Sequence, residues 1–310
     1  MNRNFSLILL FVAIMTIVSC KKDKTDDPKD PTSEQNGGNQ NEAETTDPVT
    51  YTLTVVNLNK PLGMVSGSGI YEKGTIVPVT AEPINGAHVF GWSDVEGTPS
   101  ERVIELVSDS TIVVMFEIEG VEAVDLGLSI KWATCNVGAT APEEYGNYFA
   151  WGETETKDIC NWSTYFDTTD GGSTFTEYTA GGKTMLDKKD DAAAVNMGGA
   201  WRMPTREEIN ELIANCTWTY TTTYNGKSVK GYVVTSQTNG NSIFLPAAGY
   251  QDQSAVGFVG SIGQYWTSNL YTASESKAWE LWFNQSQTSK PIKEEIGGRY
   301  VGRPVRAVMK

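Results

Sequence analysis

Residues 120–310 combine a high aromatic content with very little regular hydrophobic periodicity, and this combination constrains the fold more than any other feature. The segment holds eight of the nine tryptophans, eleven of the thirteen tyrosines and six of the ten phenylalanines. Gly, Asn, Ser and Thr occur densely along it, which predicts short strands joined by long loops. The whole chain of 310 residues has room for about two domains.

Two helices and two strands can be predicted inside this segment. Thr205 followed by Glu208 is a capping-box signature, so a helix is expected from Arg206 onward. Its apolar stripe consists of Ile209, Leu212, Ile213 and Cys216. A second short helix is expected over 190–196 and would be ended by the glycine pair at 198–199. Residues 231–236 and 242–246 are typical of strands.

The first twenty residues have the pattern of a secretion leader that ends in a lipid-attachment cysteine. Residues 7–18 are apolar apart from Thr16, and as a helix they would span only about 18 Å, too little for a bilayer core of about 30 Å. The motif that follows, IVSC at 17–20, resembles the lipobox of bacterial lipoproteins. The resemblance implies a signal peptide over 1–19 and acyl chains, palmitate among them, on Cys20, which would anchor the protein in a membrane.

The next segment, residues 20–50, is expected to be a lipidated cysteine followed by a disordered tether. It is rich in acidic residues, Lys, Pro, Gly, Asn and Gln and has no aromatic residue, so it cannot bury enough apolar surface to offset its ordering entropy. The stretch KKDKTDD at 21–27 resembles the charged signals of surface-exposed Bacteroidota lipoproteins. This resemblance implies an outer-membrane lipoprotein at the cell surface; a plain solvated linker on a periplasmic protein is the alternative.

Residues 51–119 have the alternating pattern of short β-strands. Strands are expected over 51–56, 74–81, 88–94 and 110–117, with a turn over 63–69 and a hairpin at the Asn-Gly pair 85–86. The segment resembles the internalin-type B-repeat, also called the Listeria–Bacteroides repeat. The matching residues are Gly67, Tyr71, Gly74, TAEP at 80–83, FGWS at 90–93 and VMF at 114–116. The resemblance implies a small β-grasp-like module that serves as a spacer or in adhesion.

Residues 120–310 contain six motifs in the order found in the Fibrobacter succinogenes major paralogous domain and its Bacteroidota relatives. They are VDLGLSIKWATCNVG at 124–138, YFAWGE at 148–153, WRMPTREE at 201–208, FLPAAGY at 244–250, GQYWTS at 263–268 and RPVRAV at 303–308. That family is related to the C-type-lectin-like and formylglycine-generating-enzyme superfold. The resemblance implies an α+β chain, in which a small β-grasp-like repeat module precedes a loop-rich C-type-lectin-like domain.

Charge and histidine content exclude several classes of function. The net charge of −14 argues against nucleic-acid binding, which needs a basic surface. His88 is the only histidine, so a zinc site with two histidines is excluded, and we expect His88 to be a packed or surface residue. The sugar-binding tripeptides of calcium lectins are absent from the sequence. Asp167 and Asp170 could supply oxygens to a cation, but a surface turn is the better interpretation, and no metal is expected.

The cysteines outside the leader do not predict catalysis or a cofactor. Enzymes that resemble the formylglycine-generating oxidases have two reactive cysteines late in the fold, whereas this chain has none after Cys216. Cys135, Cys160 and Cys216 are scattered and have no C-x-x-C spacing, so zinc is not expected. Outside the cytosol two of them could form a disulfide while the third stays buried, and the sequence does not select the pair.

Binding is the function that remains. Several carboxylate pairs, such as Glu143 with Glu144 and Glu207 with Glu208, could serve as acid and base, but capping or solvation explains them. We therefore predict no catalytic residues. Most aromatic residues are expected to be core, and Tyr220, Tyr224 and Tyr271, which lie in Thr-, Ser- or Asn-rich segments, are the candidates for contacts with a glycan or a protein partner. The alternatives are a structural subunit of an envelope or fimbria-like assembly and an unrecognised enzyme of the same superfold.

Overall fold

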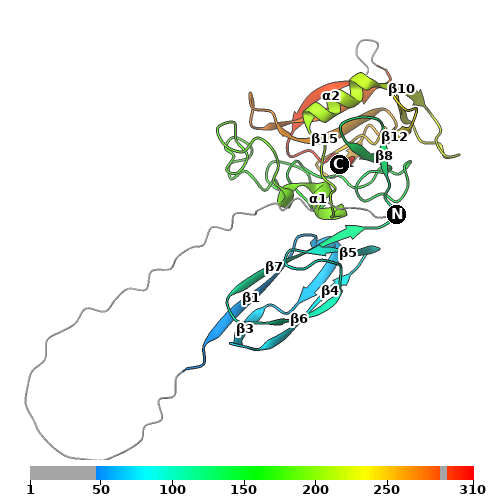
Figure 1. Cartoon of the computed structure of the whole chain (residues 1–310). Coiled ribbons are helices and arrows are strands. Elements are labelled where there is room, and N and C mark those ends of the chain that lie inside the picture. The colour runs from blue at the N-terminus through cyan, green and yellow to red at the C-terminus, as the bar shows by residue number, and fades with distance from the viewer. Residues whose placement is uncertain (1–46, 287–291) are drawn as a thin grey trace, which may run out of the picture. The chain divides into compact units, whose positions relative to one another are not determined.

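The computed structural model describes residues 47–286 and 292–310, and residues 48–310 form one compact unit. Cys20, the predicted leader and nearly all of the predicted tether lie outside the described residues. Most of the regular structure is strand, with two α-helices (Figure 1), which is compatible with an α+β fold at this coarse level.

None of the helices in the described ranges is both long enough and apolar enough to span a membrane.

Residues 50–118, which we call the β module, form two sheets around one hydrophobic cluster. The strand order is β3-β1-β7-β5 in one sheet, where β1 and β7 run parallel, and β2-β4-β6 in the other. Alternating burial along β1 and β4 directs Leu53, Val55, Val77 and Val79 into the cluster. The elements are β1 (Thr50–Asn57), η1 (Lys60–Leu62), β2 (Gly63–Ser66), β3 (Gly69–Glu72), β4 (Ile76–Pro83), β5 (Ala87–Trp92), β6 (Glu101–Glu105) and β7 (Ser110–Ile118).

Two local predictions in the β module were wrong. The segment expected to be a turn over 63–69 contains β2 and the start of β3, because Gly63 to Ser66 pair with β4 and Gly69 pairs with β1. The Asn-Gly pair at 85–86 has the positive φ angles of a tight turn, 55° and 73°. It does not close a hairpin, however, because the strands that it joins, β4 and β5, belong to different sheets.

Residues 123–309, which we call the terminal domain, contain short sheets separated by long loops. The sheets have the orders β10-β11-β12, β13-β14, β15-β16-β17 and β18-β9-β8. The strands are β8 (Ala123–Asp125), β9 (Lys131–Ala133), β10 (Cys216–Thr221), β11 (Gly231–Ser236), β12 (Ser242–Pro246), β13 (Tyr250–Asp252), β14 (Ala255–Gly257), β15 (Ile262–Leu270), β16 (Lys277–Asn284), β17 (Ile292–Gly298) and β18 (Val308–Met309). The strands predicted over 231–236 and 242–246 are confirmed.

The helix predicted from the capping box is confirmed as α2 (Arg206–Asn215). Glu208 N donates to Thr205 Oγ1 at 3.2 Å, and Thr205 N donates to Glu208 Oε2 at 2.8 Å. The helix packs on the β15-β16-β17 sheet (Figure 1), where the Arg206 guanidinium lies 3.6 Å from the ring centre of Trp279. Cys216 starts β10 instead of ending the helix.

The second predicted helix is shorter than expected. It is α1 (Ala192–Met197), and it begins after Asp191, whose carboxylate accepts a hydrogen bond from Ala194 N at 2.9 Å. The residues before it form the 3-10 helix η2 (Lys188–Asp190). Gly198 follows α1 with φ 72° and ψ −158°, a conformation that is open essentially only to glycine.

Candidate functional site

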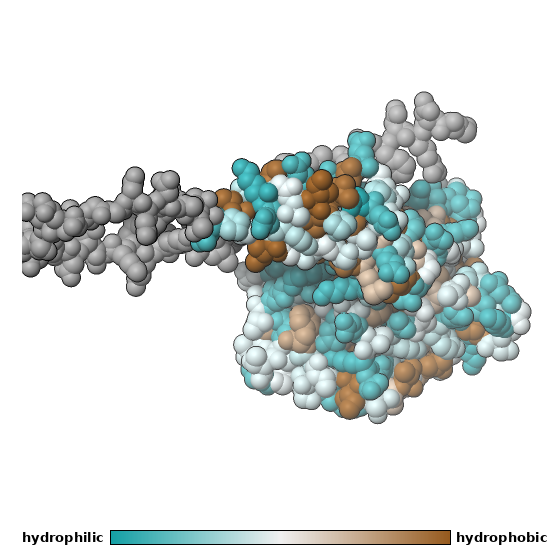
Figure 2. Space-filling view, turned by 90° about the horizontal axis from the view of Figure 1, so that it is seen from below, coloured by the Kyte–Doolittle hydropathy of each residue, from teal (hydrophilic) through white to brown (hydrophobic). Residues whose placement is uncertain are grey.

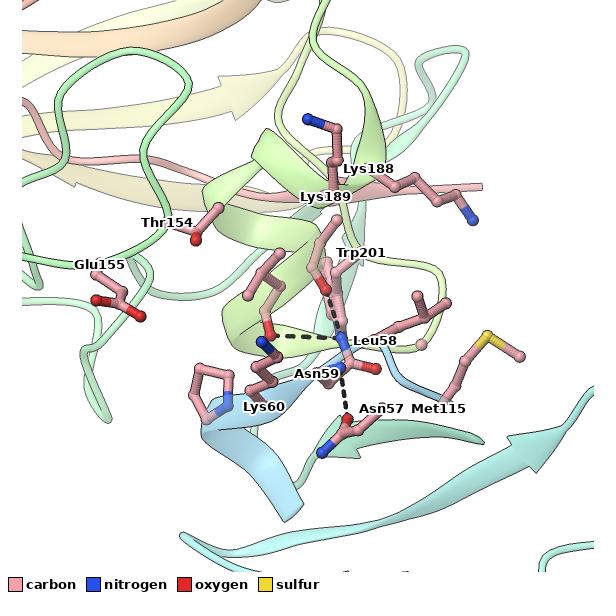
Figure 3. A pocket seen from close by; sticks show the side chains of 14 residues that line it. Asn57, Leu58, Asn59, Lys60, Met115, Thr154, Glu155, Lys188, Lys189 and Trp201 are labelled. Carbon is pink, nitrogen blue, oxygen red and sulfur yellow. Dashed lines mark hydrogen bonds between the residues drawn. The ribbon is translucent and has the colours of Figure 1, made fainter. Parts of the chain in front are cut away.

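A crevice of about 290 Å³ lies between the β module and the terminal domain. Figure 3 shows that η1 and the end of β1 face helix α1 across it. The β module lines the crevice with Asn57, Leu58, Asn59, Lys60, Pro61 and Met115. The terminal domain lines it with Thr154, Glu155, Lys188, Lys189, Ala194, Val195, Gly199 and Trp201. Half of these residues are polar or charged and the others are apolar residues or glycine, and a combination of apolar surface with polar groups is usual in a small-ligand site.

Asn59 fixes the floor of this crevice. It is buried, with 4% of its surface exposed, and its side chain uses both of its polar atoms. Asn59 Nδ2 donates to the carbonyl oxygens of Ala194 and Val195 at 2.8 and 3.4 Å (Figure 3), and Phe116 N donates to Asn59 Oδ1 at 3.1 Å. The Ala194 carbonyl also accepts from Gly198 N at 3.2 Å, so Asn59 adds a second donor to the end of α1, where the last carbonyls have few partners within the helix. The sequence contained no signal for this contact.

The two glycines after α1 form a second contact between the β module and the terminal domain. Gly199 N donates to the carbonyl oxygen of Phe116 in β7 at 3.0 Å. A Cβ atom on Gly198 would lie 1.7 Å from that same oxygen. Only glycine therefore allows the end of α1 to approach β7 this closely. The contacts of Asn59 and of this glycine pair define the geometry of the crevice.

The rim of the crevice carries charges that are not neutralised by the protein. Within residues 47–286 and 292–310, Lys60, Lys188 and Glu155 form no ion pair. Lys189 differs, because its ammonium group binds Glu177 at 2.7 Å and Asp190 at 2.9 Å. In Figure 3 the Lys60 side chain extends toward α1 and Lys188 extends away from the centre. Lys60 and Glu155 are therefore the charged groups best placed to contact a ligand.

A second, more open hollow of about 370 Å³ adjoins the crevice. The residues that line the hollow are Gly152, Glu153, Thr154, Glu155, Thr156, Lys157, Thr164, Phe166 and Asp190. Thr154 and Glu155 line both spaces, so the crevice and the hollow meet at these two residues. A ligand longer than a single small molecule could therefore extend from one into the other.

The three candidate tyrosines do not lie in this region, and all three are half-buried, not exposed as the sequence suggested. Tyr220 packs edge-on against Tyr232, with ring centres 5.5 Å apart. Tyr224 stacks on Phe244 at 4.1 Å, and Tyr271 packs edge-on against Trp279 at 5.2 Å. Tyr220 and Tyr224 belong to β10 and the loop after it, whereas Tyr271 follows β15. Their role as binding residues stays a prediction.

The aspartate loop is built differently from the surface turn that we expected. Asp170 is exposed and accepts hydrogen bonds from Ser173 N at 3.0 Å and Thr174 N at 2.8 Å, as a turn residue does. Asp167, in contrast, is 1% exposed and binds the buried guanidinium of Arg299 at 2.6 Å. Both of its carboxylate oxygens accept hydrogen bonds from protein donors, so they are engaged within the fold.

One group of carboxylates lies close enough together to hold a cation. Oxygens of Glu177, Asp187 and Asp190 lie within 4.8 Å of one another. Lysine side chains already neutralise this group, since Lys183 binds Glu177 and Asp187 and Lys189 binds Glu177 and Asp190. The arrangement is explained as a surface ion-pair network.

The disulfide that two of the three cysteines could have formed is not found among the described residues. Cys135, Cys160 and Cys216 are all free and buried. They lie in different surroundings: Cys135 Sγ contacts the carbonyl of Ala139 at 3.3 Å, and Cys216 belongs to the cluster under α2. Burial raises the pKa of each of the three thiols, which disfavours the reactive thiolate.

No family model, curated protein or solved structure matches this chain.

Proposed function

We propose that this protein is a lipid-anchored envelope protein that binds a glycan or a protein ligand and catalyses no reaction. In this proposal Cys20 anchors it in the outer membrane, facing the cell surface, and the ligand is held without a metal, a cofactor or nucleic acid. The β module would be a β-grasp-like B-repeat, and residues 120–310 would be a C-type-lectin-like domain. The lipobox-like IVSC at 17–20 and the six ordered motifs of the terminal domain support this proposal.

The observation that carries the binding proposal is the crevice beside Asn59. It is a concave space with an apolar wall, formed by Leu58, Met115 and Val195 among others, and with unpaired charges on its rim. Figure 2 shows one face of the molecule, on which apolar residues occur as separate patches among hydrophilic ones. A crevice whose walls come from four chain segments holds a ligand more specifically than such scattered patches.

Leu58→Trp should reduce ligand binding at least tenfold, because the larger side chain would fill the space that the ligand needs. Leu58 is 45% exposed, so the substitution should leave the melting temperature nearly unchanged. The measurement is a glycan array and a partner pull-down with residues 48–310, followed by titration of each ligand found. EDTA should not change the affinity.

Ile70→Trp is the matched control, because Ile70 is 72% exposed on β3 and does not line the crevice. It should bind as the wild type does. Equal affinities for the wild type and Leu58→Trp would show that the crevice is not the ligand site. Loss of binding in EDTA, restored by calcium, would contradict the metal-free proposal.

Cys20→Ser should abolish membrane retention, because no lipid can be attached without the thiol and several acyl chains are needed for durable anchoring. The measurement is incorporation of radiolabelled palmitate together with membrane fractionation. Equal labelling of the variant and the wild type would contradict lipidation at Cys20. Proteinase treatment of intact cells tests the orientation: digestion of residues 48–310 is expected, and protection would place them in the periplasm.

A further inference from the structure

The hollow next to the crevice has an exposed aromatic ring in its wall. Phe166 is 44% exposed, although it lies in a domain whose other aromatic rings are mostly buried or half-buried. It lines the hollow together with polar residues of the 152–157 segment. Leaving an apolar ring of this size in water is unfavourable, so its position beside a concave polar surface points to a ligand.

The Phe166 ring is held in place by its neighbours. Its edge packs against Tyr165, with ring centres 5.3 Å apart, and its backbone N donates to Glu153 Oε1 at 3.1 Å. A Cβ atom on Gly152 would lie 3.0 Å from the ring, so the glycine allows the ring its present position. A ring that is already ordered loses little conformational entropy when a ligand packs on it.

The groups around the ring are hydrogen-bonding side chains with an acidic balance. Glu153, Glu155 and Asp190 contribute three carboxylates, whereas Lys157 is the one basic residue of the hollow. Lys157 binds Glu153 at 2.7 Å, and Tyr178 OH and Lys189 both bind Asp190. Glu155 and Thr156 are exposed, and no partner binds their side chains in the described part of the chain. This surface repels an anionic ligand and offers acceptors to hydroxyl groups.

We propose that the hollow is a subsite for a neutral sugar ring, stacked on Phe166 with its hydroxyl groups bound by Glu155, Thr156 and Asp190. A pyranose has an apolar C–H face, which suits the negative face of an aromatic ring, and it has hydroxyl groups around its edge, which suit carboxylates. This inference rests on the proposed binding function and specifies its ligand class. Because Thr154 and Glu155 also line the crevice, a longer glycan would continue into it.

Phe166→Ala should weaken the binding of a neutral oligosaccharide about 3–10-fold, as expected for the loss of one stacked ring. The probes are maltotetraose, cellotetraose and mannotetraose, with tetragalacturonate as the acidic counterpart. They are titrated by calorimetry or NMR against residues 48–310, the compact unit that contains all four hydrophobic clusters. Phe166→Trp should retain the affinity, and at least one neutral probe should bind more tightly than tetragalacturonate.

Phe258→Ala is the matched control, because Phe258 is 55% exposed in the same domain and stacks on Tyr250 away from the hollow. It should bind as the wild type does. A preference for the acidic probe, or equal affinities for Phe166→Ala and the wild type, would overturn the subsite. Binding that persists in Phe166→Ala but is lost in Leu58→Trp overturns this inference alone. If only a protein partner and no glycan is found, this inference is also overturned. If neither a glycan nor a protein partner binds, the proposed function is overturned together with this inference.

Discussion

Asp167→Ala should destabilise residues 48–310 by about 3–5 kcal/mol, because it leaves a buried guanidinium without its counter-charge. Arg299 and Asp167 are both fully buried as side chains, and the Arg299 Nη2 to Asp167 Oδ2 distance is 2.6 Å. The aspartate also accepts hydrogen bonds from Thr176 N and Glu177 N at 2.9 and 2.8 Å. Removing the carboxylate therefore leaves these backbone N–H groups and Arg299 Nη2 without a hydrogen-bond acceptor. Urea unfolding followed by tryptophan fluorescence measures the loss.

Asp170→Ala is the control for this substitution, since it removes a carboxylate of the same loop that is exposed to solvent. It should cost clearly less stability than Asp167→Ala. Similar losses for the two variants would show that the loop, and not the buried ion pair, determines the effect.

The same ion pair should make the protein sensitive to acid. Burial raises the pKa of Asp167, but hydrogen bonds from Glu177, Thr176 and Arg299 outweigh burial, so its pKa lies below the usual value of 3.8. A carboxyl whose pKa is lowered on folding stabilises the native state above the unfolded pKa and loses that contribution as the pH falls through the folded value. The difference in unfolding free energy between wild type and Asp167→Asn should therefore be constant above about pH 5 and shrink below pH 3.8.

Local sequence signals predicted local structure well. The helix α2 was predictable because the capping box between Thr205 and Glu208 is formed by residues three apart. Several strands were predictable from the alternation of apolar and polar residues, because this signal also lies within a few consecutive residues. Most aromatic residues are expected to be core, and Trp201 in the motif WRMPTREE is one that is buried, with 4% of its surface exposed.

The sequence did not predict contacts between segments that are far apart along the chain. Asp167 has the surroundings of a turn residue in the sequence, DTTDGG at 167–172, and only its contact with Arg299, 132 residues later, makes it a core residue. The candidate tyrosines were assigned to the surface from their polar neighbours, but each meets another aromatic ring from a different segment. Phe166 was missed because nothing in its local sequence distinguishes an exposed ring from a buried one.

The crevice beside Asn59 could not be predicted either, because it too is formed by segments that are far apart in the sequence. Its two walls come from η1 and α1, and Asn59 and Ala194, which meet there, are 135 positions apart in the sequence. Asn59 follows a strand and precedes Lys60 and Pro61, so its local sequence suggests an ordinary polar turn residue. The sequence signal that points to the junction is the glycine pair at 198–199, which by itself predicts only the end of a helix.

Gly198→Ala should destabilise residues 48–310 by about 3 kcal/mol and should uncouple the β module from the terminal domain. The backbone at Gly198 has φ 72° and ψ −158°, and a side chain there costs about 1–3 kcal/mol in strain. The new Cβ would also lie 1.7 Å from the Phe116 carbonyl oxygen, so the hydrogen bond from Gly199 N should be lost, at about 1 kcal/mol. Differential scanning calorimetry of wild type and variant measures both effects.

Gly240→Ala is the control that separates backbone strain from the steric clash. Gly240 also has a positive φ, 76°, but no atom lies within 4 Å of its ideal Cβ position. It should show the strain alone and keep a single unfolding transition. In Gly198→Ala the transition should broaden or split, since the β module has its own hydrophobic cluster and can unfold separately. If Gly198→Ala and Gly240→Ala lost equal stability and both kept a single transition, the β module and the terminal domain would not be held together through β7 and the end of α1. The hydrogen bonds from Asn59 Nδ2 to the carbonyls of Ala194 and Val195 would then be the contact that fixes η1 against α1 and holds the two walls of the crevice in place.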